Sequence, residues 1–135
     1  MPKSASSDNY VLGVLGAGAM GRGIVQVAAA GGLHVRLYDT RAEAVDEAIA
    51  FIRGMFARAA EKQRMSPEEA AAAGARIEAV SSMQELAACD AVIEAVVENL
   101  EVKKKVFAEL ESIVSDDTIL ATNTSSLSVT TIAAD

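Results

Sequence analysis

The stretch Gly16-Ala17-Gly18-Ala19-Met20-Gly21 decides the predicted fold because of the segments on either side of it. An apolar run over residues 10–15 precedes it and has the composition of a buried strand. A helix rich in small residues is expected to follow from residue 22, and residues 34–38 predict a second strand that ends at Asp39. Strand, G-x-G-x-x-G, helix, strand and terminal acid, in this order, form the dinucleotide-binding fingerprint.

Each glycine of the fingerprint has a physical task. Gly16 permits the tight turn, Gly18 lets the backbone approach a pyrophosphate, and Gly21 lets the helix pack closely against the strand. The helix start adds unbonded N–H groups and the positive end of the helix dipole. The predicted cofactor contacts in this region are Gly16, Ala17, Gly18, Ala19, Met20, Gly21 and Asp39.

Asp39 has nearly the spacing from the glycines that a ribose-binding carboxylate needs. A solvated loop acid, or an N-cap for the next helix, is the alternative interpretation of this residue. In the ribose role, its negative charge disfavours the 2′-phosphate of NADP, so NAD is the predicted cofactor. Arg41 opposes this inference, because its side chain could turn toward a 2′-phosphate.

Length and composition limit the classes of protein to which the chain can belong. It has 135 residues, 51% of them hydrophobic and 23% charged, which predicts one globular domain over residues 10–135 after a loose leader over 1–9. The net charge of −7 argues against nucleic acid and anionic membranes as partners. The single cysteine, Cys89, excludes an internal disulfide, and no secretory or membrane-spanning segment is evident, so we expect a cytoplasmic protein without a metal site.

Strand and helix patterns alternate along the chain, which predicts an α/β fold: a Rossmann-type doubly wound parallel sheet. The later strands are expected at 77–80, 91–96 and 119–122. Between the second and third strands the sequence predicts a helical hairpin, whose second helix begins at Ser66-Pro67-Glu68-Glu69 and ends at Gly74. In the strand order 3-2-1-4-5 the fifth strand lies at an edge, where we expect copies of this chain to associate.

Three segments together resemble the 3-hydroxyacyl-CoA dehydrogenase family, including bacterial 3-hydroxybutyryl-CoA dehydrogenases. They are Gly16–Ile24 (GAGAMGRGI), residues 92–103 (VIEAVVENLEVK) and residues 121–128 (ATNTSSLS). The predicted helical hairpin also resembles an insertion that this family uses near coenzyme A. The similarity covers nearly all of the chain and implies an NAD-binding domain that stands before a helical C-terminal domain.

The resemblance implies roles for individual residues. Glu98 and Lys103 would lie beside the nicotinamide half of NAD, Ser125 would hydrogen-bond the reacting oxygen of the acyl group, and Lys62 would contact coenzyme A. From the residues alone, Glu98 and Lys103 could equally cap and solvate a helix start, and Ser125 could be a turn hydroxyl.

The chain also departs from the family. The family's general base is a histidine, oriented by a glutamate, in a segment beyond the serine loop, whereas His34 of this chain matches nothing catalytic. We therefore expect the cofactor domain of a longer, homodimeric dehydrogenase that oxidises (S)-3-hydroxyacyl-CoA to 3-oxoacyl-CoA in fatty-acid or related metabolism, and no turnover by these 135 residues alone. The alternatives are the cofactor domain of another hydroxy-acid or sugar-acid dehydrogenase, and a nucleotide-sensing module without activity.

Overall fold

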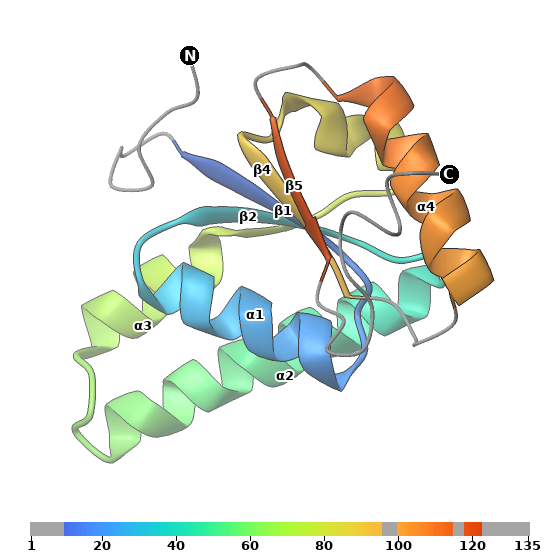
Figure 1. The fold of residues 1–135 in the computed structure, drawn as a ribbon. Helices are drawn as coiled ribbons and strands as arrows, with labels where there is room; N and C mark the ends of the chain where they lie inside the picture. Colours follow the sequence, from blue (N-terminus) through green and yellow to red (C-terminus); the bar gives the residue numbers. More distant parts are fainter. Residues whose placement is uncertain (1–9, 96–99, 115–117, 123–135) are drawn as a thin grey trace.

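A five-stranded parallel sheet forms the centre of the computed structural model, which describes residues 10–95, 100–114 and 118–122. The strands lie in the order β3-β2-β1-β4-β5 (Figure 1). Their bounds are β1 Val11–Leu15, β2 His34–Tyr38, β3 Ile77–Ala79, β4 Ala91–Glu94 and β5 Ile119–Thr122. The predicted Rossmann-type strand order is therefore confirmed for all five strands.

Helices cover both faces of the sheet (Figure 1). They are α1 Ala19–Ala30, α2 Ala42–Glu61, α3 Pro67–Ala75 and α4 Leu100–Ile113, with a 3₁₀ helix, η1, at Met83–Ala88. The helices α1, α2 and α3 lie on one face, and η1 and α4 lie on the other. None of the helices in the described ranges has the length and apolar character that crossing a bilayer requires.

Two hydrophobic clusters, one on each face of the sheet, form the core. Alternation along β1 points Val14 into the cluster beneath α1 and α2, and Leu15 into the cluster beneath η1 and α4. The first cluster includes Leu37 and Ile52, and the second includes Leu110, and all three side chains are fully buried. Burying both faces of each central strand explains why their sequences are nearly continuous apolar runs.

The helical hairpin formed by α2 and α3 is present as predicted, but α3 runs one residue beyond Gly74. Arg53 of α2 explains the difference, because its Nε donates to the carbonyl oxygen of Gly74 at 3.2 Å. A Cβ at residue 74 would lie 3.2 Å from Cγ of Arg53, so this glycine permits close helix packing rather than ending the helix. At the other end of α3, the Oγ of Ser66 accepts from the backbone N–H of Glu69 at 3.0 Å, as the predicted cap requires.

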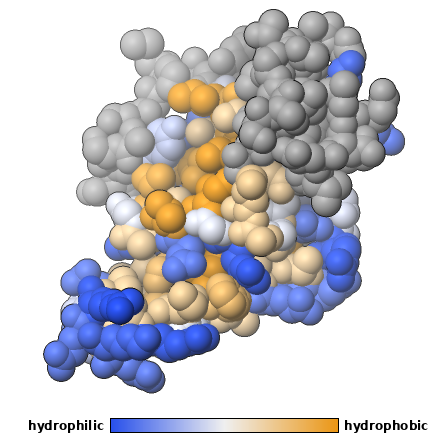
Figure 2. Space-filling view, turned by 60° about the horizontal axis from the view of Figure 1, so that its bottom comes forward, coloured by the Kyte–Doolittle hydropathy of each residue, from blue (hydrophilic) through white to orange (hydrophobic). Residues whose placement is uncertain are grey.

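The surface formed by α1 and α2 retains large hydrophobic side chains. The exposed ones on these two helices are Met20, Val27 and Phe51. Figure 2, which brings the lower part of Figure 1 forward, shows hydrophobic residues in a band between hydrophilic regions on this side of the molecule.

The carboxyl ends of the central strands meet at one edge of the sheet. Leu15, the last residue of β1, is in register with Tyr38 of β2 and with Glu94 of β4. The glycine-rich stretch therefore leaves the sheet beside Asp39, at the edge where open α/β sheets bind ligands.

Candidate functional site

A cavity of about 530 Å³ lies beyond the ends of β1, β2 and β4. Its walls come from the glycine-rich turn, the start of α1, the segment after β2 and the first half of α2, with one residue each from η1 and α4. The polar and charged residues that line it are Arg22, Tyr38, Asp39, Thr40, Arg41 and Glu47. Gly16, Ala17 and Gly18 line the same cavity, so the structure brings the predicted glycines and Asp39 together.

The glycine-rich turn has the geometry that its sequence predicts. Gly16 has a φ of +117°, in a region that side chains disfavour, and its N–H donates to the carbonyl oxygen of Tyr38 at 2.8 Å. A Cβ on Gly21 would overlap the carbonyl oxygen of Gly16, so only glycine lets α1 start this close to the turn. Glycine is therefore required at residues 16 and 21, because α1 comes so close to the end of β1.

The start of α1 is left open. Gly18 is the N-cap, no side chain caps the helix, and its first turn holds no acidic residue. A Cβ on Gly18 would meet no described residue within 4 Å, which leaves room for a ligand beside this turn. The first N–H groups of a helix have no intrahelical acceptor and lie at the positive end of its dipole, which makes this start an anion site in both shape and charge.

Asp39 ties the glycine-rich turn to the segment after β2. Its Oδ2 accepts from the backbone N–H of Ala17 at 2.8 Å, and its Oδ1 accepts from the backbone N–H of Arg41 at 2.9 Å. The side chain is half-buried, and the N-cap of α2 is Arg41, so Asp39 is neither a solvated loop acid nor that helix's cap. Oδ1 also accepts from the hydroxyl of Thr40 at 3.5 Å, whereas Oδ2 keeps a second lone pair with which it can accept a ligand hydroxyl.

The Arg41 side chain is held by a carboxylate of its own helix start. Its Nε lies 3.2 Å from Oε1 of Glu43. The backbone N–H of Glu43, and secondly the Arg41 side chain, lower the pKa of the Glu43 carboxyl, so this partner is ionised at neutral pH. The contact gives Arg41 an exposed acidic partner, although Arg41 also lines the cavity.

Arg22 is a cavity residue that the sequence analysis did not select. Its guanidinium lies over the ring of Phe51, with 4.0 Å between Cζ and the ring centroid. The sequence contains a local sign that Arg22 lies near the site, because this residue directly follows Gly21 in the first turn of α1. The sequence does not reveal the aromatic partner of Arg22, because Phe51 belongs to α2, almost thirty residues later.

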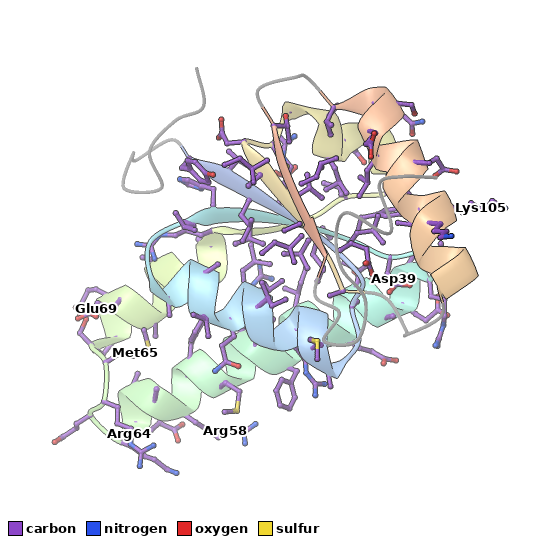
Figure 3. The ribbon with its side chains drawn as sticks, viewed as in Figure 1. Asp39, Arg58, Arg64, Met65, Glu69 and Lys105 are labelled. Atoms are coloured by element: carbon purple, nitrogen blue, oxygen red, sulfur yellow. The ribbon has the colours of Figure 1, made fainter. Side chains whose placement is uncertain are left out.

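The remaining predicted site residues fall outside this cavity or outside the described residues. Glu98 and Ser125 lie outside the described ranges, and Lys103 belongs to α4, where its side chain is not described. Lys62, at the C-terminal end of α2, lines a second hollow of about 400 Å³ together with Arg58 and Arg64. Figure 3 shows Asp39 near the start of α2 and Arg58 and Arg64 at its other end. A helix of 20 residues is about 30 Å long.

The other candidate chemistry in the described part of the chain is limited. No group of three or more histidine, cysteine or acidic side chains within these ranges could hold a metal ion. Cys89 is buried, and desolvation raises the pKa of its thiol to about 11, so it remains a neutral core residue.

These features fit a dinucleotide. The uncapped helix start, with room for a Cβ at Gly18 among the described residues, suits a pyrophosphate, and the half-buried Asp39 carboxylate can accept from ribose hydroxyls. The backbone would supply most of the phosphate donors, which reconciles an anionic ligand with a chain of net charge −7.

Comparison with known proteins identifies the class of dinucleotide domain. Residues 11–135 match the family described as the 3-hydroxyacyl-CoA dehydrogenase, NAD binding domain. The chain is 43% identical over 123 residues to the 3-hydroxybutyryl-CoA dehydrogenase of Bradyrhizobium diazoefficiens, an alignment that covers 91% of this chain and 42% of that protein. It is also 43% identical to the 3-hydroxyadipyl-CoA dehydrogenase of Escherichia coli, over 90% of this chain and 26% of that protein.

A solved structure gives the same result. The crystal structure of 3-hydroxybutyryl-CoA dehydrogenase from Escherichia coli superposes with a TM-score of 0.90 and 42% identity, over 94% of this chain and 27% of that one. The chain therefore spans less than half the length of the dehydrogenases that it matches. Sequence, fold and cavity agree that this chain belongs to the 3-hydroxyacyl-CoA dehydrogenase family and carries its NAD-binding domain.

Proposed function

We propose that this chain forms the cofactor-binding half of an NAD-dependent enzyme that oxidises (S)-3-hydroxyacyl-CoA to 3-oxoacyl-CoA. The observation that carries the proposal is the Asp39 bridge, which fixes a ribose-binding carboxylate beside the uncapped start of α1. When bound, NAD supplies the chemistry by accepting a hydride from C3 of the hydroxyacyl group. The 3-hydroxyacyl-CoA dehydrogenases among the relatives support the acyl-CoA class of substrate.

Each predicted site residue has a place in this proposal. Gly16, Ala17 and Gly18 shape the turn, the amides of Ala19, Met20 and Gly21 face the pyrophosphate, and Asp39 accepts from the ribose of the adenosine. Glu98 and Lys103 serve the nicotinamide half, and Ser125 orients the reacting oxygen. This last set rests on the family resemblance of the sequence rather than on described side chains.

We assign coenzyme A to the second hollow, where Lys62 lies. Arg58, Lys62 and Arg64 place three cations there, beside the apolar side chains of Val27 and Met65. Cations suit the phosphates of coenzyme A, and the apolar side chains suit its adenine. Titration of coenzyme A into the wild type and the Lys62→Gln variant tests this assignment, and equal affinities would contradict it.

Binding and turnover together test the proposed function. We expect the 135-residue chain to bind NADH, seen as a change in the fluorescence of NADH. We expect no oxidation of NADH when acetoacetyl-CoA is added. The physical reason is that the family's histidine base is not among these residues, and general acid–base catalysis is worth about 10²–10⁴ in rate. NADH oxidation at the rate of an intact dehydrogenase would show that the catalytic group had been misplaced.

Another hydroxy-acid or sugar-acid dehydrogenase, and a non-catalytic nucleotide sensor, remain the competing functions. The helical hairpin and its basic hollow favour the acyl-CoA function over both, because neither alternative needs a second anion site. Binding of NAD without any binding of coenzyme A would favour the alternatives.

We further propose a homodimeric, cytoplasmic parent protein and association of this chain through β5. In the described sheet β5 is the last strand, and Ile119 on it is 51% exposed. The strand contains no charge and no proline to discourage pairing with another strand. Sedimentation over a concentration series measures this association, and a monomer at every concentration would contradict it.

A further inference from the structure

Two arginines line the nucleotide cavity, and their surroundings differ. Arg41 lies 3.2 Å from the Glu43 carboxylate, whereas the guanidinium of Arg22 rests on the face of Phe51, 4.0 Å from the ring centroid. Among the described residues, neither of the ion pairs found involves Arg22. A ring face attracts the cation without accepting the in-plane N–H bonds of the guanidinium, so those donors stay available for an anion.

Arg22 lies beside the start of α1. It is in the first turn, and its backbone N–H donates to the carbonyl oxygen of Gly18 at 2.9 Å. Side chains on a helix lean toward its N-terminus, and Arg22 and Gly18 line the same cavity. No described residue lies within 4 Å of a Cβ placed on Gly18, which leaves room for a ligand at this turn.

The ring of Phe51 supports the guanidinium of Arg22. Phe51 is a large hydrophobic side chain with 42% of its surface exposed, on the face of α2 that meets the start of α1. Holding a long, flexible arginine in one orientation before the ligand arrives lowers the entropy that binding costs. The stacked guanidinium presents a fork of donors that matches a phosphate.

We propose that Arg22, seated on Phe51, is a pyrophosphate-binding residue of this domain, in addition to the backbone donors at the start of α1. The proposal rests on the proposed position of NAD in this cavity. It extends the site beyond the glycine fingerprint, because it adds a full positive charge to a helix start that otherwise offers only partial charges.

Three probes separate a phosphate contact from a general loss of structure: NAD⁺, ADP and adenosine, each titrated by calorimetry. We expect Arg22→Gln to weaken NAD⁺ and ADP about tenfold, since a charged hydrogen bond is lost, and to leave adenosine unchanged. Phe51→Leu keeps the apolar bulk but removes the ring, and should weaken the two phosphate ligands about threefold. Arg22→Lys keeps the charge without the fork and should lie between the wild type and Arg22→Gln.

Lys105→Gln is the matched control. Lys105 is an exposed cation on α4 that does not line the cavity (Figure 3), and its loss changes the net charge by the same amount. We expect its affinities for all three probes to stay within about twofold of wild type, because exposed charges outside the site are screened. Thermal melting of every variant checks the fold, and Arg22→Lys replaces Arg22→Gln if the latter does not fold.

The outcomes distinguish the role of Arg22 from the position of NAD in the cavity. If the wild type binds NAD⁺ and the Arg22 variants bind ADP equally well, the role of Arg22 is wrong while the cofactor site stands. If Arg22→Gln weakens adenosine as much as ADP, the residue supports the fold rather than the pyrophosphate, and the proposal is also wrong. If the wild type binds neither NAD⁺ nor ADP, the cofactor site itself is wrong.

Discussion

The starts of α1 and α3 show two different uses of a helix N-terminus. Ser66 caps α3 by accepting from the backbone N–H of Glu69 at 3.0 Å, and Glu68 and Glu69 place negative charge in the first turn. The start of α1 has Gly18 as its cap, no capping side chain and no acid in the first turn. Thus α3 has a side chain that accepts from one of its first N–H groups and acids near its dipole, whereas among the described residues α1 has neither.

A side chain between α1 and the glycine-rich turn should cause the largest loss of stability and of NAD binding. A Cβ at residue 21 would overlap the carbonyl oxygen of Gly16, so Gly21→Ala forces the helix away from the end of β1. We expect a loss of about 3 kcal/mol in the free energy of unfolding, the upper range for overpacking, together with loss of NAD binding. Urea denaturation measures the first, and a variant with wild-type stability would contradict the close packing.

A capping side chain at the start of α1, like the one at the start of α3, should make this helix start repel a pyrophosphate instead of binding it. Gly18→Asp adds a capping carboxylate where a Cβ has open space and where φ is −74°, so the fold tolerates it. The new charge would repel a pyrophosphate by about 2–3 kcal/mol in a partly solvated site, which predicts about 100-fold weaker NAD binding. Stability should not fall.

Gly23→Asp is the control for this change. It adds the same charge further along α1, at an exposed glycine whose Cβ would also meet nothing within 4 Å. We expect it to weaken NAD binding much less than Gly18→Asp. Equal losses in calorimetry would mean that net charge, rather than the helix start, controls binding.

We expect Asp39 to determine which nucleotide the start of α1 accepts. In Asp39→Asn the negative charge that repels a 2′-phosphate is removed, and the preference for NAD over NADP should fall about tenfold. The amide replaces one of two oxygens that accept backbone N–H bonds, so some stability is also lost. The ratio of the two affinities is the informative measurement, because a loss of stability alone leaves that ratio unchanged.

Removing the cap of α3 should have the smallest effect and should leave the ligand untouched. Ser66→Ala loses the bond to the Glu69 N–H, which costs about 1 kcal/mol of unfolding free energy. Affinity for NAD should equal that of the wild type, since α3 contributes no residue to the cavity near Asp39. A change in NAD affinity would show that the two helix starts are coupled.

The sequence predicted the strands, their order and the glycine-rich turn because these depend on local patterns. The lower limit of β4 at Ala91 and the whole of β5 were placed correctly, whereas β4 ends at Glu94 rather than at residue 96. A capping box follows β3 in the structure, where the Glu85 carboxylate accepts from the backbone N–H of Ser82 at 3.0 Å. Ser82 and Glu85 lie three positions apart, so this contact is local in the sequence.

The contacts that the sequence did not predict join distant segments. Asp39 was assigned to a ribose, but its bond to the backbone N–H of Ala17 depends on how β1 and β2 pair. Likewise, the seat of Arg22 on Phe51 exists only because α1 and α2 pack together. Glu98 and Ser125 lie outside the described residues, and their roles stay predictions from the family resemblance.

The most direct test of the central claim is calorimetry of the unmodified 135-residue chain with NAD⁺ and NADP⁺. The uncapped start of α1 beside Asp39 predicts that NAD⁺ binds and that NADP⁺ binds at least about tenfold more weakly, because its 2′-phosphate meets a carboxylate. Arg41 should not rescue NADP⁺ binding while Glu43 holds it. Equal or tighter binding of NADP⁺, or no binding of either nucleotide, would contradict the account.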